Sequence, residues 1–102
     1  MTLNELPKLC VLYFHADWCS PCKQVKPAVQ RMKDEGVNVV EIDIEKDENA
    51  ELVSFLQIYS IPAFSVIEDR KEILNQRGVI DLKKTKEIIE LYKNSDLYQV
   101  EE

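Results

Sequence analysis

Short apolar runs along the chain predict a small sheet. Residues 9–14 form an unbroken apolar run with β-branched and aromatic members, which is typical of a central strand covered on both faces. A second strand is predicted at 37–44, where apolar side chains recur at every other position. Residues 63–67 and 72–75 are predicted to form a strand pair joined by the charged turn 68–71.

Helical spacing of apolar residues predicts three helices between and after these strands. The first begins near Cys22, and Gly36 follows it as a left-handed cap. Pro27 lies inside this helix and is expected to kink it, because proline removes a backbone donor and clashes with the preceding turn. Residues 49–59 form the second helix, and Asp81 is the predicted N-cap of the last. The expected order of elements is β-α-β-α-β-β-α.

Length and composition limit the classes of protein to consider. The chain has 102 residues with only two glycines and four prolines, so it has no linker and is predicted to be one domain, 1–102, with a core of about 9–94 and a polar tail at 95–102. Its net charge of -6 disfavours nucleic acid and anionic membranes as partners. No apolar stretch approaches the ~20 residues that a membrane helix needs.

Cysteine usage predicts a reducing compartment. Three cysteines are too few, and odd in number, for a secreted disulfide framework, whereas one Cys-x-x-Cys pair is typical of intracellular redox chemistry. The first residues show no basic start followed by an apolar run, as an export signal would. We therefore expect a cytoplasmic protein.

The candidate chemistry lies in residues 18–22, Trp-Cys-Ser-Pro-Cys, where the first strand ends and a helix begins. A helix N-terminus offers unpaired backbone donors and a positive dipole end, which favour a thiolate over a thiol. Cys19 is therefore the predicted nucleophile. Cys22, one turn further on, can attack the mixed disulfide formed on Cys19 and release the substrate.

These residues carry a family resemblance. The block 13–23, with Pro27 and the segment 60–63 (Ser-Ile-Pro-Ala), resembles the thioredoxin family over roughly residues 9–94. The resemblance implies an α/β thioredoxin fold, with a central mixed sheet of about four strands flanked by helices. It also implies general dithiol–disulfide exchange on disulfide-containing proteins, with no bound cofactor and with electrons from a thioredoxin-reductase-like flavoenzyme.

The resemblance also implies a substrate-binding surface. Ile61–Pro62 is expected to be a cis peptide that faces the cysteines, and X-Pro bonds are the ones able to adopt that form. Trp18 and Pro21 are expected to complete the surface beside Ile61 and Pro62. Trp18 is interpreted as part of a docking surface, with a place in the core as the alternative.

The chain departs from the family pattern in several places. Ser20 stands where the commonest motif has glycine, which leaves the redox potential open. The family's N-terminal β-α unit is expected to be shortened or absent, and the sheet edge there open. Tyr13 and Glu41 stand where thioredoxins usually carry a buried Asp and a Lys. We hypothesise that Glu41, with a raised pKa, accepts the proton of Cys22.

Structural rather than catalytic interpretations of these and neighbouring residues stay open. Glu41 can instead reach solvent, while Tyr13 fills the space of the missing acid or donates a hydrogen bond to Glu41. A zinc site needs four ligands, and besides the Cys-x-x-Cys pair only Cys10 and His15 are candidates, so no metal is predicted. Cys10 is interpreted as an inert core residue, and His15 as a surface histidine rather than one that tunes Cys19.

Two rival functions are compatible with the sequence. One is a thioredoxin-fold binding module, or a subunit of a larger assembly, in which the cysteines are incidental. The other is a glutathione-linked redoxin, which the Trp-Cys-x-Pro-Cys type of motif disfavours.

Overall fold

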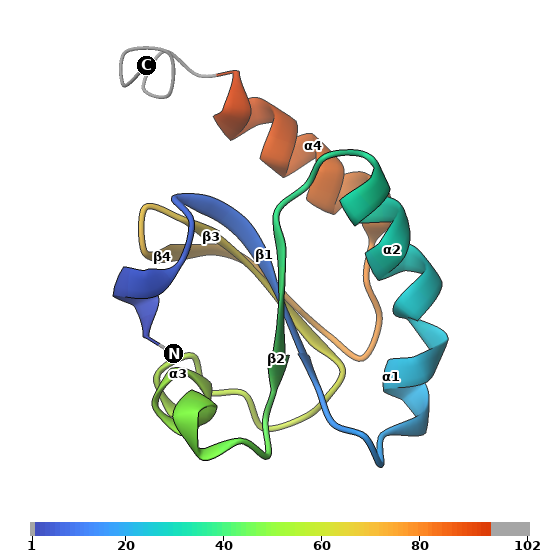
Figure 1. Ribbon diagram of the computed structural model, residues 1–102. Helices are drawn as coiled ribbons and strands as arrows, with labels where there is room; N and C mark the ends of the chain where they lie inside the picture. Colours follow the sequence, from blue (N-terminus) through green and yellow to red (C-terminus); the bar gives the residue numbers. More distant parts are fainter. Residues whose placement is uncertain (1, 95–102) are drawn as a thin grey trace.

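Strand β1, Leu9–His15, lies inside a four-stranded sheet (Figure 1). In the computed structural model, which describes residues 2–94, the strand order is β2-β1-β3-β4. Strand β2 is Val39–Asp43, β3 is Ala63–Glu68 and β4 is Lys71–Arg77. β1 pairs in parallel with β2 and antiparallel with β3, and β3 pairs antiparallel with β4. This mixed sheet is the one predicted.

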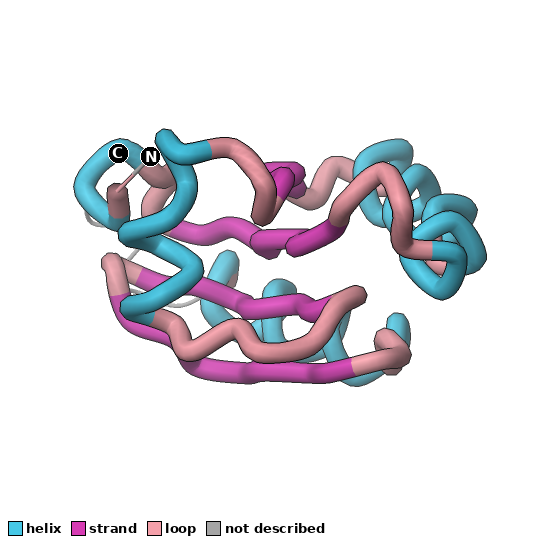
Figure 2. The backbone as a smooth tube through the Cα atoms, turned by 90° about the horizontal axis from the view of Figure 1, so that it is seen from below, coloured by secondary structure: helices cyan, strands magenta, loops and turns pink. Residues whose placement is uncertain are grey.

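Helices connect the strands and cover both faces of the sheet. They are α1 (Ser20–Gln24), α2 (Lys26–Asp34), α3 (Ala50–Phe55) and α4 (Leu82–Lys93), with 3-10 turns η1 (Leu3–Glu5) and η2 (Asp47–Asn49). α1, α2 and α4 lie on one face, whereas α3 and the N-terminal turn lie on the other (Figures 1 and 2).

The ends of the described chain differ in what they add to the sheet. Within the described residues, η1 is the one element before β1, and β2 is an edge of the sheet. The predicted polar tail, 95–102, lies outside the described residues. None of the helices that residues 2–94 form is long and apolar enough to cross a membrane.

The side chains of β1 alternate between two apolar clusters. Val11 and Tyr13 face α1, α2 and α4, whereas Cys10, Leu12 and Phe14 face α3 and the N-terminal turn. All five side chains are at most 1% exposed. Burial on both faces explains why the sequence here is an unbroken apolar run rather than an alternating one.

Pro27 divides the helix that was predicted after Cys22 into two. It lies in the first turn of α2, where a missing backbone N–H costs little. The carbonyl of Lys23, one turn before, accepts instead from the N–H of Val25, the residue between α1 and α2. The predicted kink is thus a break between two helices, and it leaves α1 with only five residues.

Residues with positive φ end two of the helices. Gly36 follows α2 with a φ of 88°, as predicted, and the N–H groups of Gly36 and Val37 donate back to the last turn of α2. The second predicted helix, 49–59, was too long. The α-helix there ends at Phe55, because Gln57 takes a φ of 56° and its N–H closes the same kind of cap.

The hairpin between β3 and β4 turns through two residues with positive φ. Asp69 has a φ of 48° and Arg70 a φ of 66°, which is the backbone of the tight turns that favour Asn-Gly. Aspartate tolerates this region, whereas arginine has no local hydrogen bond that offsets the steric cost. The predicted strand pair is confirmed. Its turn contains Arg70 in a backbone conformation that is unfavourable for arginine.

Arg70→Gly is expected to raise the free energy of unfolding by about 0.5–1 kcal/mol. Relief of the left-handed conformation gains roughly 1–2 kcal/mol, and the greater freedom of glycine in the unfolded chain offsets about 0.4–1 kcal/mol of that. The lost ion pair with Asp69 is exposed and contributes little. Urea unfolding measures the change. Lys71→Gly, in the adjoining strand, is the control and should destabilise the protein. A loss of stability in Arg70→Gly would show that the backbone at Arg70 is not strained.

Candidate redox-active site

Three of the loops that leave the sheet at the end where β1 stops carry the candidate residues, and the loop after the parallel strand β2 leaves at the same end. Phe14 of β1 pairs with Ala63 of β3, and Ala63 pairs with Arg77 of β4. The loop after β1, the loop before β3 and the loop after β4 therefore lie at the same end. The N–H of Gly78 donates to the carbonyl of Pro62 at 2.8 Å and joins the last two loops.

Cys19 and Cys22 form a disulfide at the start of α1 in this cluster of loops. Their Cα atoms are 5.3 Å apart, within the usual range for disulfides, and both side chains are buried. Cys19 is the N-cap of α1, and its Sγ accepts a hydrogen bond from the N–H of Cys22 at 3.2 Å. In the dithiol the same donor favours a thiolate on Cys19. The structure thus places the predicted nucleophile at the helix start.

The residues predicted to bind substrate take different positions around the disulfide. Trp18 is 64% exposed, which excludes the alternative that it belongs to the core. Pro21 is also exposed, and Ile61 is half buried against the cluster that contains both cysteines. The Ile61–Pro62 peptide is cis, as predicted. The ring of Pro62 is buried, whereas Ile61 is partly accessible, so Ile61 is the residue of this pair that a substrate can contact.

Sequence reasoning missed a further apolar residue at this end of the sheet. Val79 directly follows Gly78, whose φ of 85° turns the chain away from β4, and 72% of its surface is exposed. Its loop is the one hydrogen-bonded to the loop of Pro62. The one available signal was an apolar residue after a glycine that ends a strand, and this pattern is common in turns.

Tyr13 lies beneath the disulfide and contacts it through the backbone. Its hydroxyl donates to the carbonyl of Cys22 at 2.7 Å, and its ring stacks on those of His15 and Phe64, with centroid distances of 5.1 and 5.2 Å. The alternative in which Tyr13 donates to Glu41 is therefore excluded, because the hydroxyl donates to Cys22 instead. Burial raises the pKa of Tyr13, and the negative charge of Glu41 raises it further.

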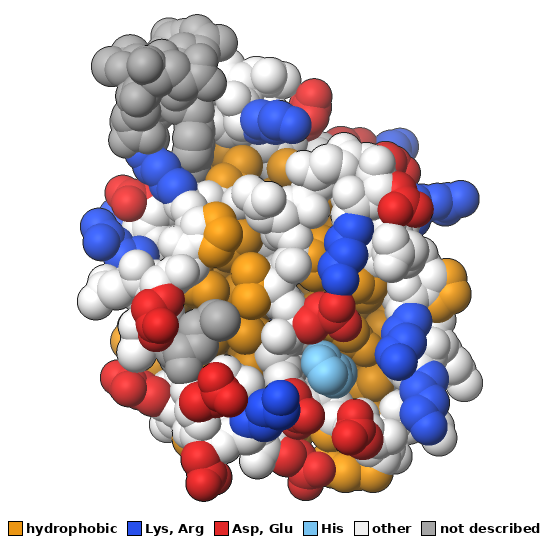
Figure 3. Space-filling view, viewed as in Figure 1, with side chains coloured by type: hydrophobic (Ala, Val, Ile, Leu, Met, Phe, Trp, Pro, Cys, Tyr) orange, Lys and Arg blue, Asp and Glu red, His pale blue; other side chains and the backbone are white. Residues whose placement is uncertain are grey.

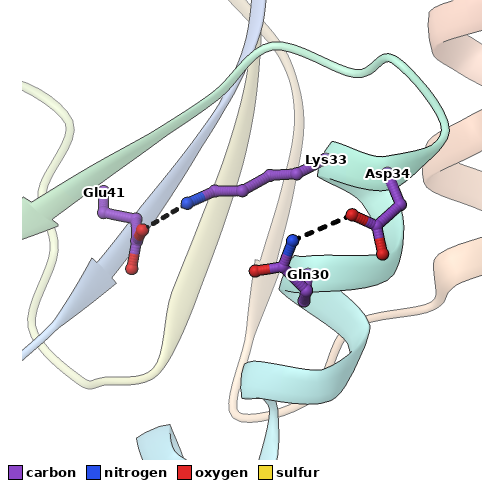
Figure 4. Close-up of polar contacts among 4 residues, drawn as sticks. All are labelled: Gln30, Lys33, Asp34 and Glu41. Carbon is purple, nitrogen blue, oxygen red and sulfur yellow. Dashed lines mark hydrogen bonds and ion pairs between the residues drawn. The ribbon is translucent and has the colours of Figure 1, made fainter.

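Glu41 reaches away from the disulfide toward α2. Its carboxylate accepts from the Nζ of Lys33 at 2.5 Å (Figure 4), with 42% of its side chain and 35% of that of Lys33 exposed. The hydrogen bond from Lys33 is the main cause that lowers the pKa of Glu41. The expectation of a raised pKa was thus wrong, because Glu41 lies on the edge strand β2 beside solvent and a cation.

The environments of the remaining candidate residues, Cys10 and His15, are typical of structural residues. Cys10 is fully buried in the apolar cluster on the α3 face, and burial raises the pKa of its thiol to about 11, which favours the interpretation as an inert core residue. His15 is half buried against the ring of Tyr13. Within residues 2–94, no three His, Cys, Asp or Glu side chains gather in a group able to hold a metal ion.

Charged side chains are distributed unevenly around this end of the molecule. Figure 3 shows basic side chains along the side of α1 and α2 and acidic ones gathered near the lower end, where the chain passes from β2 to α3. The basic residues are Lys23, Lys26, Arg31 and Lys33, and the acidic ones include Glu45, Asp47, Glu48 and Glu51. The basic side chains thus lie on the two helices that follow Cys19.

Comparison with known proteins identifies the family. The family model described as Thioredoxin matches residues 2–92, almost the whole of the described chain. The chain belongs to the thioredoxin family. Its fold agrees, since a solved mutant thioredoxin from Halobacterium salinarum NRC-1 superposes with a TM-score of 0.74 at 26% identity, covering 91% of this chain and 81% of that one.

Curated thioredoxins match this chain at about one-third identity. Thioredoxin X, chloroplastic, of Arabidopsis thaliana is 33% identical over 97 residues, 92% of this chain. The chain spans 53% of the length of that relative, about half. A thioredoxin of Ophiophagus hannah is 31% identical over 89 residues, covering 87% of this chain and 84% of the relative. The Cys19–Cys22 pair lies at disulfide distance in the active-site position of this thioredoxin-family fold.

Glu41→Gln is expected to leave the rate of mixed-disulfide release unchanged from pH 6 to 8, because a carboxylate with a lowered pKa is a weak proton acceptor. It should reduce stability slightly at pH 7, by about 0.2–1 kcal/mol for an exposed pair. Because the folded pKa is lowered, this stabilisation is fully present above the unfolded pKa of about 4.3 and is lost as the pH falls through the folded pKa, so the difference should vanish in acid. The rate of mixed-disulfide release and urea unfolding, each measured at several pH values, test the two expectations. Slower release in Glu41→Gln would show that Glu41 has a catalytic role.

Proposed function

We propose that this chain reduces disulfide bonds in other proteins by dithiol–disulfide exchange. The observation that carries the proposal is the Cys19–Cys22 pair at disulfide distance, with Cys19 at the N-cap of α1 and the N–H of Cys22 directed at its sulfur. A pair in this arrangement can exist as a dithiol or a disulfide without moving the backbone far. The membership in the thioredoxin family supports the same activity.

The proposed reaction has two exchange steps. The thiolate of Cys19 attacks one sulfur of the substrate disulfide, forms a mixed disulfide and displaces the other substrate sulfur as a thiolate. The thiol of Cys22 then loses its proton and its sulfur attacks the Sγ of Cys19. The Cys19–substrate bond breaks, and its electron pair leaves on the second substrate sulfur. The substrate gains two electrons and, from solvent, two protons, while Cys19 and Cys22 become the disulfide.

The surface around the cysteines fits an extended protein segment rather than a small molecule. Trp18 and Val79 are exposed, Ile61 is half buried, and their loops meet at one end of the sheet. Small apolar contacts of this kind favour recognition through the substrate backbone, as in strand addition, with little selection for side chains. We infer that the substrates are disulfide-containing proteins of many kinds.

A partner must return electrons to the disulfide that each cycle leaves. Such exchange needs only the two cysteines of this chain, so we propose that no cofactor is bound and that a flavoenzyme resembling thioredoxin reductase supplies the electrons. A reducing compartment, which we propose to be the cytoplasm, keeps the pair mostly as the dithiol. The rival proposal of a binding module is disfavoured because both cysteines and the exposed Trp18 are present together.

Cys22→Ser is expected to accumulate mixed disulfides with a protein substrate, whereas Cys19→Ser forms none and loses reduction altogether. The reason is that attack by Cys19 precedes resolution by Cys22. Non-reducing electrophoresis after mixing each reduced variant with insulin detects the adducts, and Cys10→Ala, which removes the third thiol without burying a hydroxyl, is the matched control, expected to behave as the unaltered protein. Trapping by Cys19→Ser alone would reverse the roles, and full reduction by both variants would refute the dithiol mechanism.

Insulin reduction should be supported by NADPH with a thioredoxin reductase and only weakly by glutathione with its own reductase. The Trp-Cys-x-Pro-Cys sequence, residues 18–22, resembles thioredoxins rather than glutathione-linked redoxins. The turbidity of precipitating insulin chains, with NADPH consumption, measures both rates, and the Cys19→Ser variant gives the background. A faster reaction with glutathione would favour the redoxin alternative.

A further inference from the structure

A single hydrogen bond connects β1 to the resolving cysteine. The hydroxyl of Tyr13 donates to the carbonyl of Cys22 at 2.7 Å, and both groups are buried. The ring of Tyr13 is held by stacking on Phe64 of β3, with the planes at 13° to one another, and on His15 at 27°. Because Tyr13 belongs to a strand paired along both edges, the hydroxyl is a fixed donor beneath α1.

The carbonyl of Cys22 needs such a donor because α1 is short. A helix leaves its last four carbonyls without partners from its own turns, and α1 has only five residues. The break before Pro27 prevents α1 and α2 from forming one continuous helix that would satisfy these carbonyls. A buried carbonyl without a partner is costly, so the hydroxyl of Tyr13 both satisfies this group and ties α1 to the sheet.

We propose that Tyr13 is a positioning residue for the second exchange step: its hydroxyl holds the backbone of Cys22 so that the Cys22 sulfur stays within reach of the mixed disulfide on Cys19. The proposal rests on the proposed dithiol exchange. In that step the Cys22 sulfur bonds to the Sγ of Cys19, and the substrate sulfur leaves with the electron pair of the broken bond. Attack on a disulfide is directional, so a loosely held Cys22 spends less time in a productive position.

Tyr13 acts here by position and not as an acid or base. Burial and the charge of Glu41 raise the pKa of its phenol and keep it protonated, so it donates a hydrogen bond and cannot take the proton of Cys22. The titratable or charged groups that face it are His15 on its own strand and Glu41 on β2, which is paired with Lys33 from α2; Phe64 on β3 is apolar. The proton of Cys22 therefore leaves by another route, and its loss is separable from the role of Tyr13.

Tyr13→Phe tests the proposal, because it removes only the hydroxyl and keeps the stacked ring. The fully reduced protein is mixed with one equivalent of 2,2′-dithiodipyridine in a stopped-flow instrument. Attack by Cys19 releases one pyridine-2-thione at a rate proportional to probe concentration, and attack by Cys22 releases a second at a rate independent of it. The matched control is Tyr92→Phe in the last turn of α4, which lies beside Leu9 at the start of β1, away from the end of β1 that leads to the cysteines.

We expect Tyr13→Phe to slow the second phase about fivefold, the rate factor of roughly one net hydrogen bond, and to leave the first phase unchanged. Tyr92→Phe should change neither phase. An equal second phase in Tyr13→Phe and the unaltered protein would overturn the positioning role, even if urea unfolding shows a loss of stability. Equal slowing of both phases would overturn it as well, since it would show general damage to the site.

Two further measurements keep the outcomes separate. An unaltered protein that shows no second phase and leaves insulin intact would overturn the proposed function itself, and the role of Tyr13 with it. If circular dichroism shows that Tyr13→Phe does not fold, the hydroxyl proton of Tyr13 is followed by NMR in the unaltered, reduced protein. A slowly exchanging hydroxyl proton close to α1 supports the proposal; a rapidly exchanging one overturns it.

Discussion

The burial of β1 on both faces is the constraint on which the rest of the structure depends. The strand pairs with β2 on one edge and β3 on the other, and its alternating side chains belong to both apolar clusters. Each covering helix therefore packs against a surface to which β1 contributes. Because the chain passes from β1 into α1 within five residues, the position of Cys19 is fixed by a strand whose five central residues are all buried.

Hydrophobic pattern was sufficient to predict the sheet, because strand burial leaves a local signature in the sequence. Residues 9–14 had no polar interruption, and the structure buries this run from both sides. Helix ends were harder. The positive φ of Gly36 was predictable because glycine adopts this conformation readily. Gln57 and Arg70 also have positive φ but are not glycines. Residue type therefore could not locate the end of α3 or the form of the hairpin turn.

The candidate site was predictable where its residues adjoin in sequence and unpredictable where folding brings them together. Cys19 and Cys22 lie on one helical turn, so their spacing alone indicated their relation. The partner of Tyr13 depends instead on where α1 breaks and on which face of β1 lies beneath it. Alternation along β2 correctly predicted that Glu41 lies on the face of the sheet covered by α1 and α2. The sequence could not show that Glu41 forms an ion pair with Lys33 of α2 instead of facing Cys22.

Glu41 faces Tyr13 across the β1–β2 pair and takes its charge partner, Lys33, from α2. A lysine at position 41, as in the family pattern, would here face a neutral phenol across the β1–β2 pair and lack its carboxylate partner. Glutamate at that position finds its opposite charge on α2 instead, where the pair remains half exposed and needs little desolvation. In this chain the charge pair therefore lies at the surface, and the space below Cys22 is filled by a phenol that stays neutral near pH 7. Control over Cys22 then comes from hydrogen-bond geometry, because the group closest below it carries no charge to change with pH.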